Sequence, residues 1–363
     1  MKNVVISSTH ASALGGRISI EFEDVLRNLH FGEDDIVLIG GSLMDGYGSN
    51  TSDFDVYVIS EKPPRFEEFP VHRHHRYVCQ QGILNSVTDY MPSTGRILDT
   101  QYRTKEQLRA LQTSVQGAFS QASQRTKMLI NTMSVSDQRT IYRLYSAHAL
   151  KGKAEFENLM KSGLSRDQFC YLLFRNVALD YPLFNDVVGA WRDGDLLMGC
   201  ERARFFLSRI AQGLTNMFGN TNSEMKWILR ALERLPDPIQ PMVMKYRELI
   251  SRGLGGAHEM RQVILDCINL SDEFYATSRS LLNSTSCFMS IEDSERITRQ
   301  EIDGYKSWHR DLTKEFAIRC RLFRSGLPPL VEFLPETEGE RLSLFLDHSD
   351  LQLTKNSSQP VNF

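Results

Sequence analysis

One segment, IVLIGGSLMDGYGSNTSDFDVYVI from Ile36 to Ile59, constrains the fold of this chain more than any other. Its first four residues are apolar and are followed by Gly40 and Gly41, a pattern typical of a buried strand that ends in a tight turn. After a polar spacer, polar and apolar residues alternate over positions 53–58, as in a strand with one apolar face. The segment therefore predicts two neighbouring strands joined through a glycine turn.

The second of these strands carries two acidic residues on one face. Because side chains alternate along a strand, Asp53 and Asp55 project from the face opposite the apolar residues, roughly 7 Å apart along the strand. Two carboxylates this close repel each other, and each raises the pKa of the other unless a cation lies between them. A hard divalent cation such as Mg²⁺, which prefers oxygen ligands, relieves that repulsion. The pair therefore predicts a metal site.

The glycine turn supplies a second kind of binding group. Gly40 and Gly41 allow backbone conformations that other residues avoid and let a ligand approach the chain closely. Backbone amides after such a turn, together with the hydroxyl of Ser42, can bind phosphate oxygens. A phosphate site beside a carboxylate pair indicates metal-assisted phosphoryl or nucleotidyl transfer. The alternative is an ordinary glycine turn followed by a solvated strand face with incidental acids.

In this arrangement the chain resembles the DNA polymerase beta-like nucleotidyltransferase superfamily. The residues of the segment also resemble those of the small-molecule branch of this superfamily, which includes aminoglycoside nucleotidyltransferases. The residues that carry the resemblance are Gly41-Ser42 and, after about ten residues, Asp53-Phe54-Asp55. The resemblance implies an α+β fold: a small mixed β-sheet nucleotidyltransferase domain with flanking helices, followed by a largely helical domain. It also implies that Gly41, Ser42 and Ser52 bind the nucleotide.

Enzymes of this family carry a third carboxylate on a later strand, beside the first two. Asp99 is the candidate, because the segment 97–98 begins a predicted strand and the residues Thr104–Gln107 match a capping box that begins the next helix. Asp89, which also lies on a predicted strand before a turn, is the alternative. Many relatives have Asp-x-Glu at this point, whereas this chain has Gln101, which leaves the identity of the general base open.

The rest of the first hundred residues predicts short strands. Apolar and aromatic runs predict strands at 77–79, 87–91 and 96–102, with a turn at 92–95 between the last two. The segment 72–76, HRHHR, lacks the ligand spacing of a zinc site, so a solvated strand edge or a basic rim near a polyphosphate is preferred to a metal site.

Two further segments precede the first glycine turn. Residues 1–16 indicate a mobile lead-in, since they contain a run of small polar residues and no periodic apolar pattern. Residues 18–29 have apolar residues at helical spacing and predict an amphipathic helix.

From residue 104 to about 271 the pattern changes to successive helices. Capping boxes and apolar periodicity predict helices that begin at Ser165, span 196–217, and run from the box at 221–224 to a stop at Pro236. The predicted domains are a nucleotidyltransferase catalytic domain at 1–115, a helical substrate- or nucleotide-binding domain at 116–271, and a C-terminal helical extension with a frayed tail at 272–363.

The stretch GNTNSEMKW at Gly219–Trp227 resembles the Lys-Trp helix of the substrate-binding domain in related small-molecule nucleotidyltransferases. The resemblance implies that Lys226 reaches the nucleotide triphosphate. A lysine beside a helix N-terminus can help to attract an anion. The alternative is that Lys226 is an ordinary surface lysine.

The composition limits the partners. With 363 residues, 41% hydrophobic and 24% charged, the chain is long enough for two or three globular domains. A formal net charge of −3 does not favour a nucleic acid partner. Six scattered cysteines without a CxxC pair fit reduced thiols, no stretch is long and apolar enough to predict a membrane span, and no signal peptide is predicted, so we expect a cytoplasmic location.

These observations favour a nucleotidyltransferase in which Asp53, Asp55 and Asp99 hold Mg²⁺, with two ions expected. The expected donor is ATP, and the expected acceptor is a hydroxyl or other group of a small molecule or short peptide. An enzyme that forms polynucleotides or oligonucleotides is one alternative, and it would ordinarily show basic faces or aromatic stacking platforms. A catalytically inactive module that binds a nucleotide or a partner protein is another.

Overall fold

The computed structural model describes residues 4–13, 18–65, 76–80, 83–91, 93–124, 133–161, 163, 165–282, 292–293, 296–297, 300, 318–322 and 325–334. The chain divides into two compact units, residues 1–117 with 133–166 and residues 118–132 with 167–363.

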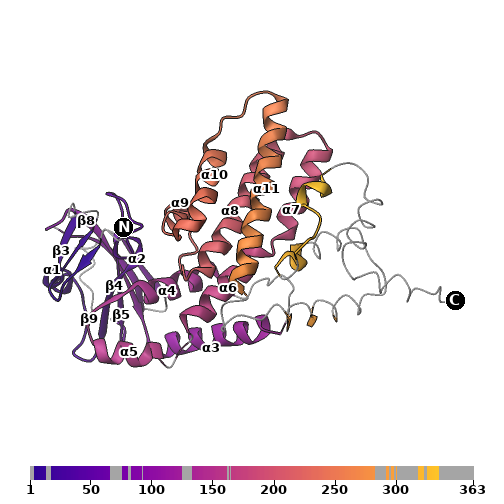
Figure 1. The fold of residues 1–363 in the computed structure, drawn as a ribbon. Coiled ribbons are helices and arrows are strands. Elements are labelled where there is room, and N and C mark those ends of the chain that lie inside the picture. The colour runs from indigo at the N-terminus through magenta and orange to yellow at the C-terminus, as the bar shows by residue number, and fades with distance from the viewer. Residues whose placement is uncertain are drawn as a thin grey trace. The chain divides into compact units, whose positions relative to one another are not determined.

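The first unit is built from strands and helices (Figure 1). Its elements are β1 (Val5–Ile6), β2 (His10–Ala13), β3 (Ile18–Glu21), α1 (Phe22–Arg27), β4 (Ile36–Gly40), α2 (Gly41–Met44), β5 (Phe54–Ile59), β6 (Arg76–Gln80), β7 (Ile83–Met91), β8 (Arg96–Arg103), most of α3 (Lys105–Ala122), α4 (Val135–Ser146), β9 (His148–Lys151) and α5 (Lys153–Lys161). Strands β1, β2 and β3 form a separate antiparallel sheet.

The main sheet has six strands in the order β6-β7-β8-β5-β4-β9. Strands β5 and β8 run parallel, and the other neighbours are antiparallel, so the sheet is mixed. Every residue of β4 and β5 is buried, because these two strands lie inside the sheet and both of its faces are covered. The α+β fold and the small mixed sheet predicted from the sequence are therefore confirmed.

The two faces of β5 bury different side chains. Phe54 and Val56 belong to a core with Ile18, Ile20 and other residues of the small sheet and α1. On the opposite face lies a second core, which combines β4 and β5 with helices α3, α4 and α5; its buried members are Ile36, Leu38, Tyr57, Ile59, Leu108, Leu144, Phe156 and Leu159. The alternation predicted for positions 53–58 thus places Asp55 on the face that α4 covers.

The prediction for the N-terminal region was wrong. Residues 5–6 and 10–13 form β1 and β2, where a mobile lead-in was expected, and residues 18–21 form β3, where a helix was expected. Ile18 and Ile20 alternate with exposed neighbours and are both buried, so they fit a strand as well as a helix over so short a span. Of the helix predicted at 18–29, only residues 22–27 are helical, as α1.

The predicted run of helices from 104 to 271 is interrupted by β9, which pairs with β4. Residues 133–166, which contain α4, β9 and α5, belong to the first unit and complete its sheet. The four residues of β9 are too short to show a strand period in the sequence. The predicted boundaries at 115 and 271 remain predictions, but the return of 133–166 to the first unit was not foreseen.

The strands and the turn around Asp99 are as predicted. Predicted runs 77–79, 87–91 and 96–102 lie within β6, β7 and β8. In the turn before β8, the amide of Gly95 donates a hydrogen bond to the carbonyl oxygen of Met91 at 2.8 Å. The capping box at the start of α3 forms in both directions, since the amide of Thr104 donates to Gln107 Oε1 (2.9 Å) and the amide of Gln107 donates to Thr104 Oγ1 (3.0 Å).

The second unit is helical in its described part. Its elements are α6 (Arg166–Ala178, which begins at the boundary), α7 (Tyr181–Arg192), α8 (Leu196–Met217), η3 (Met225–Trp227), α9 (Ile228–Leu232), η4 (Asp237–Ile239), α10 (Gln240–Ser251), α11 (Ala257–Leu282) and η5 (Leu330–Phe333). Helices α7, α8, α10 and α11 run roughly alongside one another (Figure 1). The predicted helix at 196–217 is confirmed as α8.

Two details of the helical prediction were wrong. Leu197 and Phe205 fit the apolar spacing that predicts the helix at 196–217, but they are 64% and 45% exposed. The capping box at 221–224 does not form as expected; Asn222 Oδ1 accepts the amide of Glu224 (2.9 Å), and the chain enters α9 through the 3₁₀ turn η3. An Asn side chain that bonds the backbone two residues on competes with the helical cap.

Some predictions concern residues outside the described part of the chain. These are the histidine segment 72–75 and most of the extension 272–363. Within the residues that the structure describes, no helix is both long enough and apolar enough to cross a bilayer.

The capping box at Thr104 generates a stability prediction. Changing Thr104→Ala removes the acceptor for the amide of Gln107, and we expect the free energy of unfolding to fall by about 1 kcal/mol. Thr113→Ala on the same helix is the control, because its hydroxyl bonds only the helical carbonyl of Arg109, so we expect no loss there. Equal effects of the two changes in a urea titration would contradict the capping assignment.

Candidate active site

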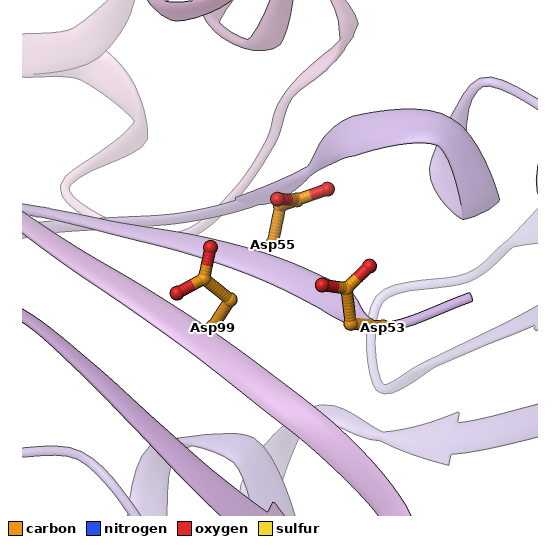
Figure 2. Close-up of side chains that lie close together, drawn as sticks. All are labelled: Asp53, Asp55 and Asp99. Carbon is orange, nitrogen blue, oxygen red and sulfur yellow. The ribbon is translucent and has the colours of Figure 1, made fainter. Parts of the chain in front are cut away.

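Three aspartates, two on neighbouring strands and one directly before the first of them, come together in the first unit. Strands β5 and β8 run parallel in a register that places Asp55 directly beside Asp99. Asp53 lies two residues before Asp55 and therefore on the same face. One carboxylate oxygen from each of the three lies within 4.8 Å of the others. Figure 2 shows the three carboxylates on the same side of the two strands.

The register also separates the two candidates for the third acid. Across β7 and β8, Thr88 lies opposite Asp99 and Asp89 lies opposite Leu98. Directly opposite residues share a face of the sheet, so Asp89 lies on the face of Leu98, which is buried in the core on the other side. The structure therefore brings Asp99, and not Asp89, to Asp53 and Asp55.

Gly41 is required by the position of Asp55. Its φ is +80°, a left-handed conformation that favours glycine. A Cβ atom at this position would lie 1.7 Å from Asp55 Oδ2 and 2.6 Å from its Cγ, far inside any contact distance. The glycine turn thus allows the Asp55 carboxylate to lie directly against the backbone.

Ser42 follows Gly41 in α2, and its carbonyl oxygen closes the turn. It accepts the amides of Tyr47 (2.8 Å) and Gly48 (2.7 Å). The side chain of Ser42 is half-buried. These bonds hold the segment after the turn in place beside Asp55, while the predicted contact of Gly41 and Ser42 with a nucleotide remains a prediction.

Ser52 holds the loop that ends at Asp53. Its hydroxyl accepts the amide of Ser49 (2.8 Å), and its carbonyl oxygen accepts a hydrogen bond from Arg96 Nη1 (3.1 Å). These contacts fix the backbone immediately before Asp53. The predicted contact of Ser52 with a nucleotide remains a prediction.

A cation that was not predicted from the sequence lies in the same site. Arg143 Nη2 from α4 forms an ion pair with Asp55 Oδ1 at 2.6 Å, and Arg143 Nη1 donates to the hydroxyl of Tyr57 at 2.8 Å. Asp55 is only 5% exposed. The one sequence signal for this contact is that Arg143 lies within the otherwise apolar and aromatic run Ile141–Tyr145, where a charged side chain needs a partner.

Burial shapes the titration of these groups. Burial raises the pKa of Asp99, Arg143 partly opposes that rise, and the charge of Asp53 adds to it. Burial alone would lower the pKa of Arg143, but Asp55 and Tyr57 more than offset it, so the pKa is raised. Burial raises the pKa of Tyr57 to about 12, against the effect of Arg143. At neutral pH, Tyr57 is therefore a neutral acceptor and Arg143 is charged.

Gln101 lies two residues after Asp99 and on the same face. A side-chain hydrogen bond from Gln101 and one from Thr88 favour the ionised form of the Asp99 carboxyl. The oxygen of Gln101 in turn accepts Arg103 Nη2 at 3.3 Å. Because an amide does not accept a proton at neutral pH, Gln101 orients Asp99 and cannot serve as a general base.

The donor set fits a hard divalent cation. Three carboxylates supply only oxygen ligands, which Mg²⁺ and Mn²⁺ prefer over softer metals. Their separation within 4.8 Å allows one ion to contact all three. Within the part of the chain that the structure describes, Asp53, Asp55 and Asp99 are therefore a group that could hold a metal.

Lys226 belongs to the second unit. Its side chain is exposed in η3, with Nζ 5.5 Å from the ring centre of Trp227, and the guanidinium of Arg230 lies 5.1 Å from the same ring. Both distances fit cation–π contacts. The predicted contact of Lys226 with a triphosphate remains a prediction.

Comparison with solved structures gives a likeness, whereas comparison with family models and curated proteins gives none. No model of a known protein family matches the chain, and no curated protein matches it. Among solved structures, the chain is similar to a nucleotidyltransferase-like protein from Exiguobacterium sibiricum 255-15, with 9% sequence identity and a TM-score of 0.35, over 89% of this chain and 85% of that chain. At this TM-score the likeness carries no argument, and the assignment of function rests on the residues of the site.

The close approach of Gly41 to Asp55 generates a prediction. Gly41→Ala and Gly95→Ala both place a side chain at positive φ, which costs about 1–2 kcal/mol. Gly95 has open space around the added methyl group, whereas at Gly41 the methyl group would overlap the Asp55 carboxylate. We expect Gly41→Ala to lower the free energy of unfolding by at least about 1 kcal/mol more than Gly95→Ala. Equal losses in denaturant titrations would show that the approach is not tight.

A second prediction concerns Asp99. Since its pKa is raised in the folded protein, the stabilisation that its proton provides is present below its ordinary pKa and is lost as the pH rises through the raised value. Asp99→Asn should therefore raise the melting temperature of the metal-free protein at pH 7 and abolish any stabilisation by Mg²⁺. Asp89→Asn, on the other face, should change neither; a matching effect there would refute the assignment of Asp99.

Proposed function

We propose that this protein is a metal-dependent nucleotidyltransferase of the DNA polymerase beta-like superfamily, small-molecule branch. It transfers a nucleoside monophosphate, with ATP as the expected donor, to a hydroxyl or other group of a small molecule or short peptide, and releases pyrophosphate. The observation that carries the proposal is the convergence of Asp53, Asp55 and Asp99 within 4.8 Å beside the glycine turn at Gly41.

Each group has a stated role in this proposal. The three aspartates hold Mg²⁺, with two ions expected, and when bound the metal neutralises charge on the triphosphate and on the departing pyrophosphate. The amides after Gly41 and the hydroxyl of Ser42 bind the β- and γ-phosphates. Ser52 positions the loop before Asp53 and contacts the nucleotide. The positive charge of Lys226 contacts the triphosphate.

The reaction forms a bond between the acceptor oxygen and the α-phosphorus and breaks the bond from that phosphorus to the pyrophosphate oxygen. The proton of the acceptor hydroxyl needs a base. Asp99 is the candidate, because burial raises its pKa and makes it a better proton acceptor than an exposed carboxylate. If Asp99 serves only as a ligand of the second metal ion, another group must take this proton.

The cysteines support a proposal about the cellular setting. The described cysteines are all free thiols: Cys79, Cys170, Cys200, Cys267 and Cys320. Free thiols are typical of reducing compartments, which supports a cytoplasmic location as part of the proposal.

The activity itself can be tested with four nucleoside triphosphates against a library of metabolites and short peptides, with pyrophosphate release as the signal. Asp53→Asn should lower turnover by two or more decades, on the order of 3 kcal/mol of transition-state stabilisation, because it removes one carboxylate of the metal site. Asp34→Asn, an exposed acid on a turn, is the control and should be as active as the unaltered protein.

Near-normal Mg²⁺-dependent release by Asp53→Asn would refute the proposed site. Nucleotide binding that does not depend on Mg²⁺, together with no pyrophosphate release for any acceptor, would instead indicate a binding module without chemistry.

The role of Lys226 has its own measurement. Lys226→Ala should weaken triphosphate binding by roughly 1–3 kcal/mol, the scale of a charge-assisted hydrogen bond, and should leave the affinity for the bare nucleoside unchanged. Lys245→Ala removes another exposed lysine of the second unit and should change neither affinity. If calorimetry finds the same triphosphate affinity in Lys226→Ala and Lys245→Ala, Lys226 does not contact the triphosphate and is an ordinary surface lysine.

A further inference from the structure

The aspartate cluster has a cation of its own. The guanidinium of Arg143 lies between the carboxylate of Asp55 and the hydroxyl of Tyr57, at 2.6 Å and 2.8 Å. Asp55 and Tyr57 are two residues apart on β5 and so present their side chains on one face to the same group. Arg143 thus meets the first requirement of a buried carboxylate, which is a partner of opposite charge.

The backbone is arranged to bring Arg143 to this position. A Cβ atom at Gly40 would lie 3.0 Å from the carbonyl oxygen of Arg143 and 3.4 Å from the Cα of Ala147. The end of α4 therefore approaches the end of β4 at a distance that a larger residue at position 40 would disturb. The absence of a side chain at Gly40 allows the close approach of the helix that carries Arg143. The absence of a side chain at Gly41 allows the close approach of the Asp55 carboxylate. The two glycines together therefore allow the two charged groups to come into contact.

The two oxygens of Asp55 face different neighbours. Oδ1 is bound to Arg143 and is fully enclosed, whereas Oδ2 lies against the backbone of Gly41. Arg143 also attracts Asp99 electrostatically, so its charge is felt by more than one member of the cluster. Three carboxylates with one guanidinium carry a net charge of about −2 where the carboxylates alone would carry −3.

We propose that Arg143 is a positioning residue that acts as a resident counter-ion: it holds the Asp55 carboxylate in place in the metal-free protein, and divalent cation binding occurs against its positive charge. The inference rests on the proposed metal site. A dication that binds the same carboxylates takes over the neutralisation of Asp55, so the ion pair with Arg143 stabilises the metal-free form more than the metal-bound form. By linkage, Arg143 lowers the affinity for the metal and keeps the site assembled after the metal leaves.

The test compares Arg143→Met with Arg139→Met. Both remove one positive charge from α4, but the side chain at 139 is exposed, one turn before the site. Mg²⁺ is titrated into nucleotide-free protein by calorimetry, and melting temperatures are measured in EDTA and in saturating Mg²⁺. For Arg143→Met we expect the dissociation constant for Mg²⁺ to fall by about tenfold or more, because a like charge near the ion is removed.

We also expect Arg143→Met to melt below the unaltered protein in EDTA and to regain most of that difference in Mg²⁺, because the metal replaces the lost partner of Asp55. A merely structural arginine would show the same deficit in both conditions. Arg139→Met should match the unaltered protein in both measurements. An unchanged or weaker Mg²⁺ affinity for Arg143→Met, or a deficit that Mg²⁺ does not repair, would overturn the inference.

Because loss of the partner of a buried carboxylate is strongly destabilising, Tyr57→Phe provides a second variant. It leaves the ion pair in place but removes the hydroxyl that restrains the guanidinium, and should tighten Mg²⁺ binding by roughly two- to tenfold. Unchanged affinity in Tyr57→Phe would count against the inference if Arg143→Met does not fold. If the unaltered protein binds no Mg²⁺, the proposed metal site is wrong. If the unaltered protein binds Mg²⁺ and the variants bind it with the same affinity, only the proposed role of Arg143 is wrong.

Discussion

Repulsion among three carboxylates is the interaction on which this structure depends. Asp53, Asp55 and Asp99 present oxygens within 4.8 Å of one another on a largely covered face of a sheet, where water screens them poorly. The parallel register of β5 and β8 creates the cluster, Gly41 makes room for it, and Arg143 supplies one compensating charge. An arrangement that costs stability without a ligand is typical of a site that is built to bind one.

Much of this site could be predicted from the sequence because its main signals are local. The apolar run that ends at Gly40, the glycine turn and the alternation around Asp53 and Asp55 all lie within one short segment. Asp99 could be predicted because a capping box at Thr104, which forms as expected, marks the end of its strand. Its choice over Asp89 needed the register of β7 and β8, which no local pattern specifies.

What could not be predicted depends on contacts between distant segments. Arg143 reaches Asp55 only because residues 133–166 return to the first unit and add β9 to the sheet beside β4. The N-terminal strands are stabilised by pairing with one another and by the core that they share with Phe54 and Val56, and their short apolar patterns fit more than one structure. In the second unit, the side chain of Asn222 bonds the backbone where a helical cap was expected.

The most direct test of this account is to locate a divalent cation in a crystal. Mn²⁺, which takes the same oxygen ligands as Mg²⁺ and scatters anomalously, can be diffused into crystals of the nucleotide-free protein. The account predicts an anomalous peak within coordination distance of oxygens from Asp53, Asp55 and Asp99, with occupancy lost in Asp99→Asn and kept in Asp89→Asn. A peak held by other residues, or no peak at these three at saturating Mn²⁺, would contradict it.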